Sequence, residues 1–153
     1  MNYVYGTWSA LCALGAAGQD LRSKPVRRAV GWLLRTQNAD GGRGESGDSY
    51  KLDYKGFEPS TSVASRTAWA LLGLMAAGEA DHPAAARGVA YLASTQGKDG
   101  FWNEAFHTAT GFPRVFCLRY HGYSKFFPLW ALARYRNLKR GNSRAAIFGM
   151  QPA

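Results

Sequence analysis

An internal repeat with a period of about sixty residues is the feature that most restricts how this chain can fold. The segment TWSALCALGAAG at 7–18 returns as TAWALLGLMAAG at 67–78, and AVGWLLRTQNADGGRGE at 29–45 returns as GVAYLASTQGKDGFWNE at 88–104. A weaker third copy of the first half is FPLWALARY at 127–135. Repeats of this length are single supersecondary units that bury their apolar faces against their neighbours. The chain is therefore predicted to contain about two and a half copies of one unit.

Each unit is predicted to be a pair of helices. Apolar residues of the first helix of unit two recur at helical spacing, as at Leu71, Leu74 and Met75, and Gly78 follows its end as Gly18 follows its counterpart. These first helices are apolar almost all round, so we expect them to be buried, whereas the second helices are amphipathic. The pattern predicts an all-α fold, an α/α barrel or toroid with inner and outer rings, here incomplete.

Charge narrows the choice of partners. The formal net charge is +9, and basic residues gather in LRSKPVRR (21–28) and RYRNLKRGNSR (134–144). This excess favours anionic partners, and the two clusters are interpreted either as solvated surface or as an attraction to anionic lipid. No nucleic-acid-binding motif is present and the aromatic residues are interleaved with aliphatic ones, so nucleic acid is not predicted as a partner. No metal-ligand spacing or phosphate-binding loop is found, and no cofactor is expected.

The second half of each unit carries a specific motif. In YLASTQGKDGFWNE, Gln96 is followed by Asp99-Gly100, then by Trp102 and Glu104. This pattern resembles the QW motif of triterpene cyclases. The earlier copy, WLLRTQNADGGRGE, has Gln37 but carries Arg43 where the motif has tryptophan. A glutamine at a helix end can bond to exposed backbone groups of the next helix, so these motifs are interpreted as braces between hairpins.

The resemblance extends over the whole chain. The opening NYVYGTW, the segment EPSTSVASRTAWALLGLMAAG and the closing GFPRVFCLRYHGYSKFFPLWALARYRNLKRGNSR are similar to the C-terminal part of bacterial squalene-hopene cyclases. Arg66 stands where the family usually has glutamine. The resemblance implies that residues 1–153 are the C-terminal part of the catalytic α/α-barrel domain of such an enzyme. The implied reaction is the proton-initiated cyclisation of squalene to hopene or hopanol through carbocations.

The resemblance also implies which residues line the substrate cavity. It carries over Phe112 and Phe116 as rings that face late cations, Leu118 as a residue that shapes the pocket, and Tyr120, Tyr123 and Tyr5 as tyrosines that line or support it. The later residues, from Phe126 to Tyr135, are expected to be mainly barrel core. The family's general acid lies in an Asp-x-Asp-Asp motif, which this sequence lacks. No catalytic residue is therefore assigned, and the chain alone is expected to be inactive.

Further partners follow from the same resemblance. They are squalene or a related polyprenyl substrate, the remainder of the cyclase chain, a second copy in a homodimer, and the cytoplasmic side of the bacterial cytoplasmic membrane as a peripheral binding surface. An alternative from another class of protein is a non-catalytic α-helical repeat module that binds a hydrophobic ligand or a partner chain. Because two and a half hairpins cannot close a ring of six, we also expect an exposed apolar edge.

Overall fold

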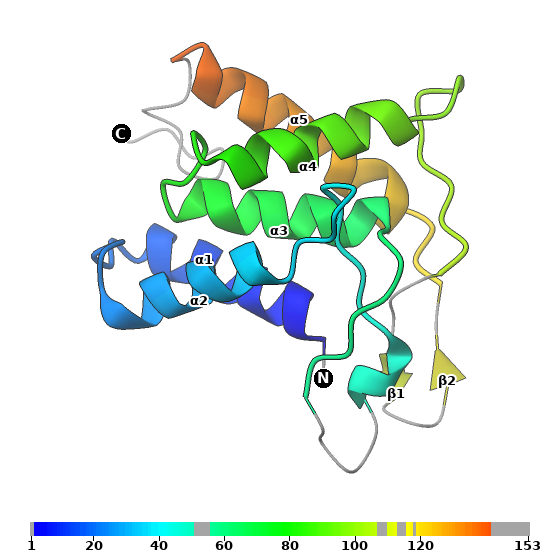
Figure 1. Cartoon of the computed structure of the whole chain (residues 1–153), viewed down its shortest axis with the longest axis horizontal. Helices are drawn as coiled ribbons and strands as arrows, with labels where there is room; N and C mark the ends of the chain where they lie inside the picture. The colour runs from blue at the N-terminus through cyan, green and yellow to red at the C-terminus, as the bar shows by residue number, and fades with distance from the viewer. Residues whose placement is uncertain (1, 51–55, 107–109, 113–115, 118, 142–153) are drawn as a thin grey trace.

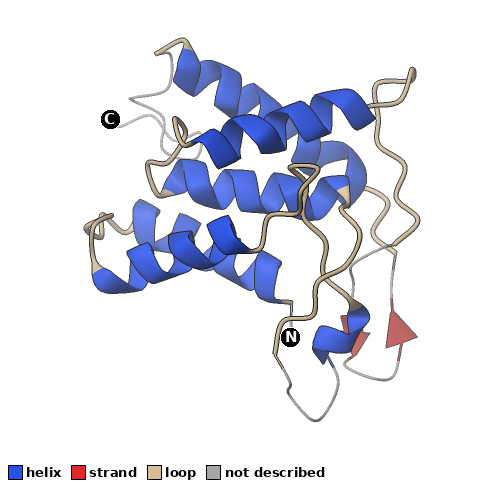
Figure 2. Ribbon diagram, viewed as in Figure 1, coloured by secondary structure: helices blue, strands red, loops and turns tan. Residues whose placement is uncertain are grey.

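The chain forms stacked helical hairpins, as Figures 1 and 2 show. The structure, a computed structural model, describes residues 2–50, 56–106, 110–112, 116–117 and 119–141. The hairpins are α1 (Tyr3–Ala16) with α2 (Lys24–Arg35) and α3 (Ala64–Ala76) with α4 (Pro83–Thr95), and α5 (Tyr123–Lys139) is the first half of a third unit. α3 packs between α1 and α5, while α2 and α4 cover α1 and α3 from one side. The predicted all-α arrangement of inner and outer helices is confirmed.

The helix boundaries follow from the residues that the repeat has in common. α1 and α3 end shortly before Gly18 and Gly78, whose φ angles of 70° and 81° lie in the left-handed region that favours glycine. α2 and α4 have proline in their first turn, at Pro25 and Pro83, where a missing N–H costs no helical hydrogen bond. The repeated glycines and prolines thus give both hairpins nearly the same length.

Among the helices that the structure describes, the central helix alone is buried all round. Twelve of the thirteen residues of α3 are buried, and the Trp69 side chain is 0% exposed. In α1 only Val4 and Leu11 are buried. The expectation that every first helix is buried is therefore confirmed for α3 and wrong for α1, because α1 lies at the edge of the stack. The free sides of α1 and α5 form the exposed apolar edges that an incomplete ring predicts.

The long connections contain short elements that periodicity did not predict. Residues Gly47–Tyr50 form a 3-10 helix, and Glu45 and Pro59 pair as an isolated bridge at the base of that loop. In the second connection, β1 (Thr110–Phe112) and β2 (Phe116–Cys117) pair in antiparallel fashion. Strands of two and three residues leave the fold class all-α. The assignment of residues 1–153 to one partial domain remains a prediction.

Candidate functional site

Aromatic rings from the three inner helices meet in one cluster. Trp69 of α3 is its centre: its ring centroid lies 5.1 Å from that of Tyr5 on α1 and 5.4 Å from that of Tyr123 on α5. Trp8 lies parallel to Trp69, with ring centroids 6.3 Å apart, and Phe127 meets both edge-on. We call the rings of Tyr5, Trp8, Trp69, Tyr120, Tyr123, Phe127 and Trp130 the aromatic cluster. It exists because the stacking of hairpins brings α1 and α5 to opposite sides of α3.

The start of α5 forms the open side of the aromatic cluster. Tyr120 stacks on Tyr123 with ring centroids 4.9 Å apart, and the Tyr120 side chain is 48% exposed. The two rings line a hollow of about 490 Å³ together with Phe126 and Phe127. Desolvation raises the pKa of the Tyr123 hydroxyl above its ordinary value of 10, and the nearby Tyr5 and Tyr120 hydroxyls raise it further. Tyr123 is therefore a neutral phenol at pH 7.

The aromatic faces of this cluster can stabilise positive charge, and Arg119 and His121 also line the hollow beside them. An aromatic face attracts a cation through the quadrupole of the ring, and the attraction grows to about 2 kcal/mol or more when water is excluded. Neutral tyrosines keep this property, whereas phenolates could remove a proton from a carbocation. The described residues contain no group of three or more potential metal ligands.

The structure brings three of the predicted cavity residues together. Tyr120 contacts Tyr123 directly, and Tyr5 reaches Tyr123 through Trp69. For Phe112 and Phe116 the structure describes only the backbone, in β1 and β2, and Leu118 lies outside the described residues. The cavity roles of all six residues remain predictions.

Sequence reasoning missed Trp8, Trp69 and Phe127 as members of this cluster. The signal was present in the spacing, because Tyr5 and Trp8 lie three residues apart and Tyr123 and Phe127 four apart, which places each pair on one helix face.

The expectation that residues 126–135 are mainly core is wrong for much of the segment. In α5 only Pro128 and Ala131 are buried, whereas the side chains of Phe126 and Trp130 are 69% and 41% exposed. These side chains lie on the free side of the last inner helix, where no further helix among the described residues covers them.

The motif after α2 braces the two hairpins, as predicted. The Gln37 side-chain amide donates to the carbonyl oxygen of Gly41 in its own loop, at 2.8 Å, and to that of Ala84 in the first turn of α4, at 2.9 Å. Arg87 of α4 donates back to the Gln37 side-chain oxygen at 2.5 Å. Gln96, in the second copy, donates to Gly100 in its own loop. The glutamine is therefore structural, and in the first copy it fixes α4 to α2.

Arg43 replaces the motif tryptophan and keeps its hydrogen bond. The Trp102 indole donates to the carbonyl of Leu92 at 2.8 Å, and the Arg43 guanidinium donates to the equivalent carbonyl, that of Leu33, through Nε at 3.2 Å and Nη2 at 3.0 Å. Arg43 is fully buried and its Nη1 has no hydrogen-bond partner among the described residues. Burial, with the positive charge of Arg87 nearby, lowers the pKa of Arg43 to about 10.

The glutamates that end both motifs cap the inner helices, a role that the motif alone did not reveal. The Glu45 carboxylate accepts from the backbone N–H groups of Tyr3 and Val4, at 2.9 and 3.0 Å, at the start of α1. The Glu104 carboxylate accepts from the N–H and the hydroxyl of Ser65, at 2.5 and 3.0 Å, at the start of α3. A carboxylate at a helix N-terminus satisfies donors that the helix leaves free.

Arg66 lies buried between these two caps. Its charge lowers the pKa of both carboxylates and thereby opposes the desolvation that raises them. The departure from the family's glutamine at this position leaves the start of α3 intact.

Within the described part of the chain, no helix is both long and apolar enough to cross a membrane.

Comparisons with known proteins agree with the motifs and the fold. Residues 1–137 match the family described as the squalene-hopene cyclase C-terminal domain. The chain is 65% identical to a squalene-hopene cyclase of Bradyrhizobium diazoefficiens over 98% of its own length, and 58% identical to one of Zymomonas mobilis over the same share. A squalene-hopene cyclase of Alicyclobacillus acidocaldarius is 46% identical over 89% of the chain. The chain spans 21% to 23% of the length of these three relatives. It belongs to the family of the squalene-hopene cyclase C-terminal domain.

Proposed function

We propose that this chain supplies part of the cavity wall of a squalene-hopene cyclase and acts together with the larger part of such an enzyme. The substrate is squalene or a related polyprenyl chain, and the products are hopene or hopanol, formed through a series of carbocations. The observation that carries the proposal is the aromatic cluster, in which Tyr5 and Tyr123 contact Trp69 and Tyr120 stacks on Tyr123. Tyr120 and Tyr123 line a hollow that is open to one side.

The chemistry of the residues supports this division of labour. The cluster can stabilise a cation as rings close, but the sequence has no Asp-x-Asp-Asp motif to protonate the terminal alkene. The acid must therefore come from the rest of the enzyme. Phe112, Phe116 and Leu118 complete the proposed wall on the strength of the family resemblance.

The proposed location is the cytoplasmic side of the bacterial cytoplasmic membrane, with peripheral attachment. Squalene is dissolved in the bilayer, so an enzyme that takes it up must meet the membrane surface. A net charge of +9 supports an attraction to anionic lipid. Assembly with a second copy of the enzyme, as a homodimer, is part of the same proposal.

A chimeric enzyme tests the proposed activity. The chain replaces the aligned C-terminal segment of the Bradyrhizobium relative, with which it is 65% identical. We expect the purified chimera to convert squalene to pentacyclic products, measured by gas chromatography and mass spectrometry. A folded chimera without any cyclised product would refute the proposal.

Two tyrosines of α5 then separate a cavity role from a packing role. Tyr123→Ala in the chimera should increase the share of incompletely cyclised products, because it removes a ring beside the proposed cation. Tyr135→Ala is the matched control, since Tyr135 lies on the same helix, packs against buried aliphatic residues of α3 and α4 and is not part of the aromatic cluster. Equal product profiles for the two variants would remove Tyr123 from the wall.

A further inference from the structure

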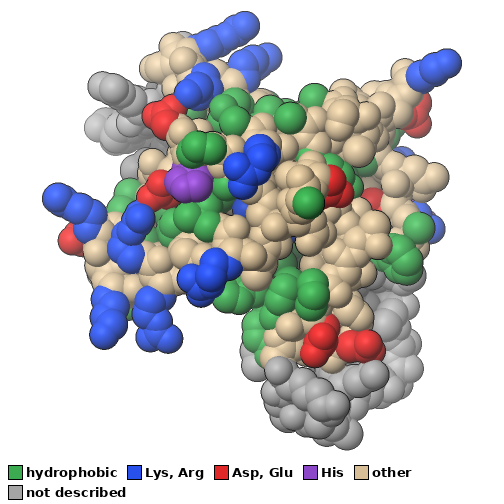
Figure 3. All heavy atoms as spheres, in the orientation of Figure 1, with side chains coloured by type: hydrophobic (Ala, Val, Ile, Leu, Met, Phe, Trp, Pro, Cys, Tyr) green, Lys and Arg blue, Asp and Glu red, His purple; other side chains and the backbone are tan. Residues whose placement is uncertain are grey.

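The outer face of α2 carries a row of cations. Lys24, Arg28 and Arg35 are exposed, and their spacing of four and seven residues places them on one side of the helix. We call these three residues the basic stripe. Figure 3 shows Lys and Arg side chains gathered on the surface over α2 and the turn before it. α2 itself contains no acidic residue.

The basic stripe borders a groove between α1 and α2. The groove has a volume of about 990 Å³, and Tyr3, Thr7 and Trp32 line it together with the stripe. Arg27, which forms an ion pair with Glu79, also lines it, so the groove combines the three positive charges of the stripe with aromatic rings of partly apolar character. Phosphate groups joined to acyl chains have the complementary composition, because their charge can meet the cations while their upper chain carbons contact the rings.

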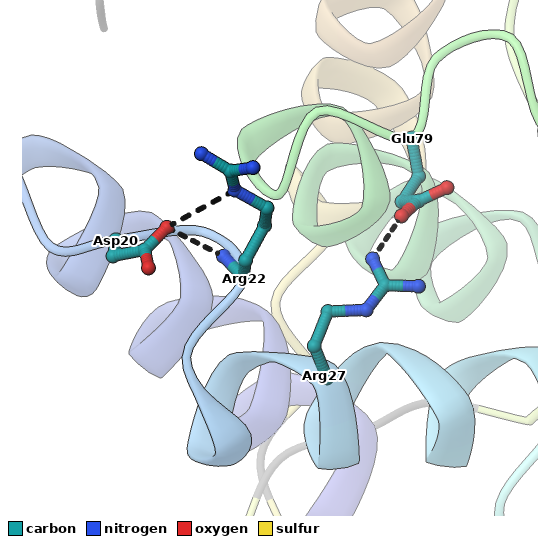
Figure 4. Close-up of polar contacts among 4 residues, drawn as sticks. All are labelled: Asp20, Arg22, Arg27 and Glu79. Carbon is teal, nitrogen blue, oxygen red and sulfur yellow. Dashed lines mark hydrogen bonds and ion pairs between the residues drawn. The ribbon is translucent and has the colours of Figure 1, made fainter.

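Neighbouring cations form ion pairs within the fold, whereas the residues of the basic stripe do not. Arg27 of α2 forms an ion pair with Glu79 after α3, and Arg22 in the preceding turn lies 3.8 Å from Asp20, both shown in Figure 4. Among the described residues, no carboxylate pairs with any member of the stripe. Its positive charge is therefore available to an external partner.

The repeat shows that the fold does not need two of these cations. α4 occupies the same place in the second unit, and it carries Pro83 and Ser94 where α2 carries Lys24 and Arg35. Arg28 corresponds to Arg87, which donates to the glutamine of the preceding loop. A protein loop that contacted α2 as the Gln37 loop contacts α4 would bind one cation of the stripe, namely Arg28. A surface of phosphate groups would contact all three cations.

We propose that the basic stripe of α2 is a contact surface for the phosphate head groups of an anionic lipid bilayer. This inference rests on the proposed peripheral membrane location and names the face that makes the contact. The stripe lies outside the aromatic cluster and takes no part in cyclisation. Two compounds distinguish a lipid head group from a free phosphate as the ligand. Phosphatidylglycerol presents its phosphate in a bilayer, whereas pyrophosphate is soluble.

Vesicle sedimentation tests the proposal on the whole chain without substrate, so its result does not depend on cyclisation. The wild type should bind vesicles of equal parts phosphatidylcholine and phosphatidylglycerol, and not vesicles of phosphatidylcholine alone. Since one basic residue contributes roughly a fivefold gain in partitioning, the triple variant Lys24→Gln, Arg28→Gln, Arg35→Gln should bind on the order of 100-fold more weakly. Added salt should weaken the binding of the wild type.

A control with the same loss of charge is Lys98→Gln, Arg136→Gln, Arg140→Gln, which removes three exposed cations elsewhere. It should keep most of the binding, and circular dichroism establishes that both variants are folded. Equal loss in the two variants, or no preference for the anionic vesicles, would overturn the proposal. Release from the vesicles by millimolar pyrophosphate at constant ionic strength would also overturn it, because the site would then belong to a soluble phosphate.

Discussion

Glu104 should contribute more to stability than any other single capping residue that the structure describes. Its carboxylate accepts both the backbone N–H and the hydroxyl of Ser65, at 2.5 and 3.0 Å, at the start of the one helix that is buried all round. Glu104→Ala leaves these two buried donors without an acceptor, at a cost of about 1–3 kcal/mol each. The variant also removes the negative charge near Arg66, which lowers stability further. It gains some stability in return, because no carboxylate has to be transferred from water into the protein. We expect a net loss of about 3 kcal/mol in the free energy of unfolding.

The repeat provides the matched control. Glu45 occupies the same motif position, but it caps α1 at the edge of the stack. The N–H of Tyr3 is only partly buried, so water can replace its acceptor, whereas the N–H of Val4 is buried and is left without one. Glu45→Ala should therefore cost less, about 1–2 kcal/mol. Glu104→Gln keeps one acceptor oxygen and should recover part of the stability. Urea unfolding followed by circular dichroism measures all three variants. Equal losses at both glutamates, or a loss below 1 kcal/mol for Glu104→Ala, would refute the reasoning.

Three further predictions concern charge and exposed surface. Trp102→Arg should lower the free energy of unfolding by about 3 kcal/mol, because it replaces a packed indole with a buried cation. The reverse change at the equivalent position, Arg43→Trp, should leave the free energy of unfolding unchanged or raise it. Equal losses for the two variants in urea unfolding would contradict this prediction. Burial raises the pKa of both Glu45 and Glu104 above 4.5, so the part of their contribution that depends on pH is complete below that pH and is lost as the pH rises through the raised values, while the capping hydrogen bonds remain. The double glutamine variant should show a flatter pH dependence, and an unchanged slope in thermal melts would refute this. Trp130→Ser should reduce the binding of a hydrophobic dye to the exposed edge, and a wild type that binds no dye would contradict it.

The repeat made the helical framework predictable because local signals define it. Apolar spacing, a glycine after each inner helix and a proline at the start of each outer helix lie within the segments that they organise. The burial of α1 was not predictable in this way, since burial depends on the neighbours of a helix and not on its own composition. α1 and α3 have similar sequences, and only α3 has a neighbour on both sides.

The aromatic cluster and the glutamate caps could not be predicted from the sequence, because both depend on contacts between residues far apart in the chain. The spacing within helices placed Tyr5 near Trp8 and Tyr123 near Phe127, but the meeting of both pairs at Trp69 depends on how three helices stack. The caps join residues about forty positions apart, and no local pattern indicates which helix each glutamate reaches. The family resemblance supplied the cavity roles of Phe112, Phe116 and Leu118, which the spacing of residues could not.

This chain is proposed to form a wall for cations, while the acid comes from the rest of the enzyme. Complementation in trans tests this division of labour. Squalene is incubated with the chain alone, with the Bradyrhizobium relative truncated before the aligned segment, and with both together, and the products are identified by mass spectrometry. Pentacyclic product is expected only from the mixture. Cyclised product from the chain alone would contradict it, as would a mixture in which the two parts associate and yield none.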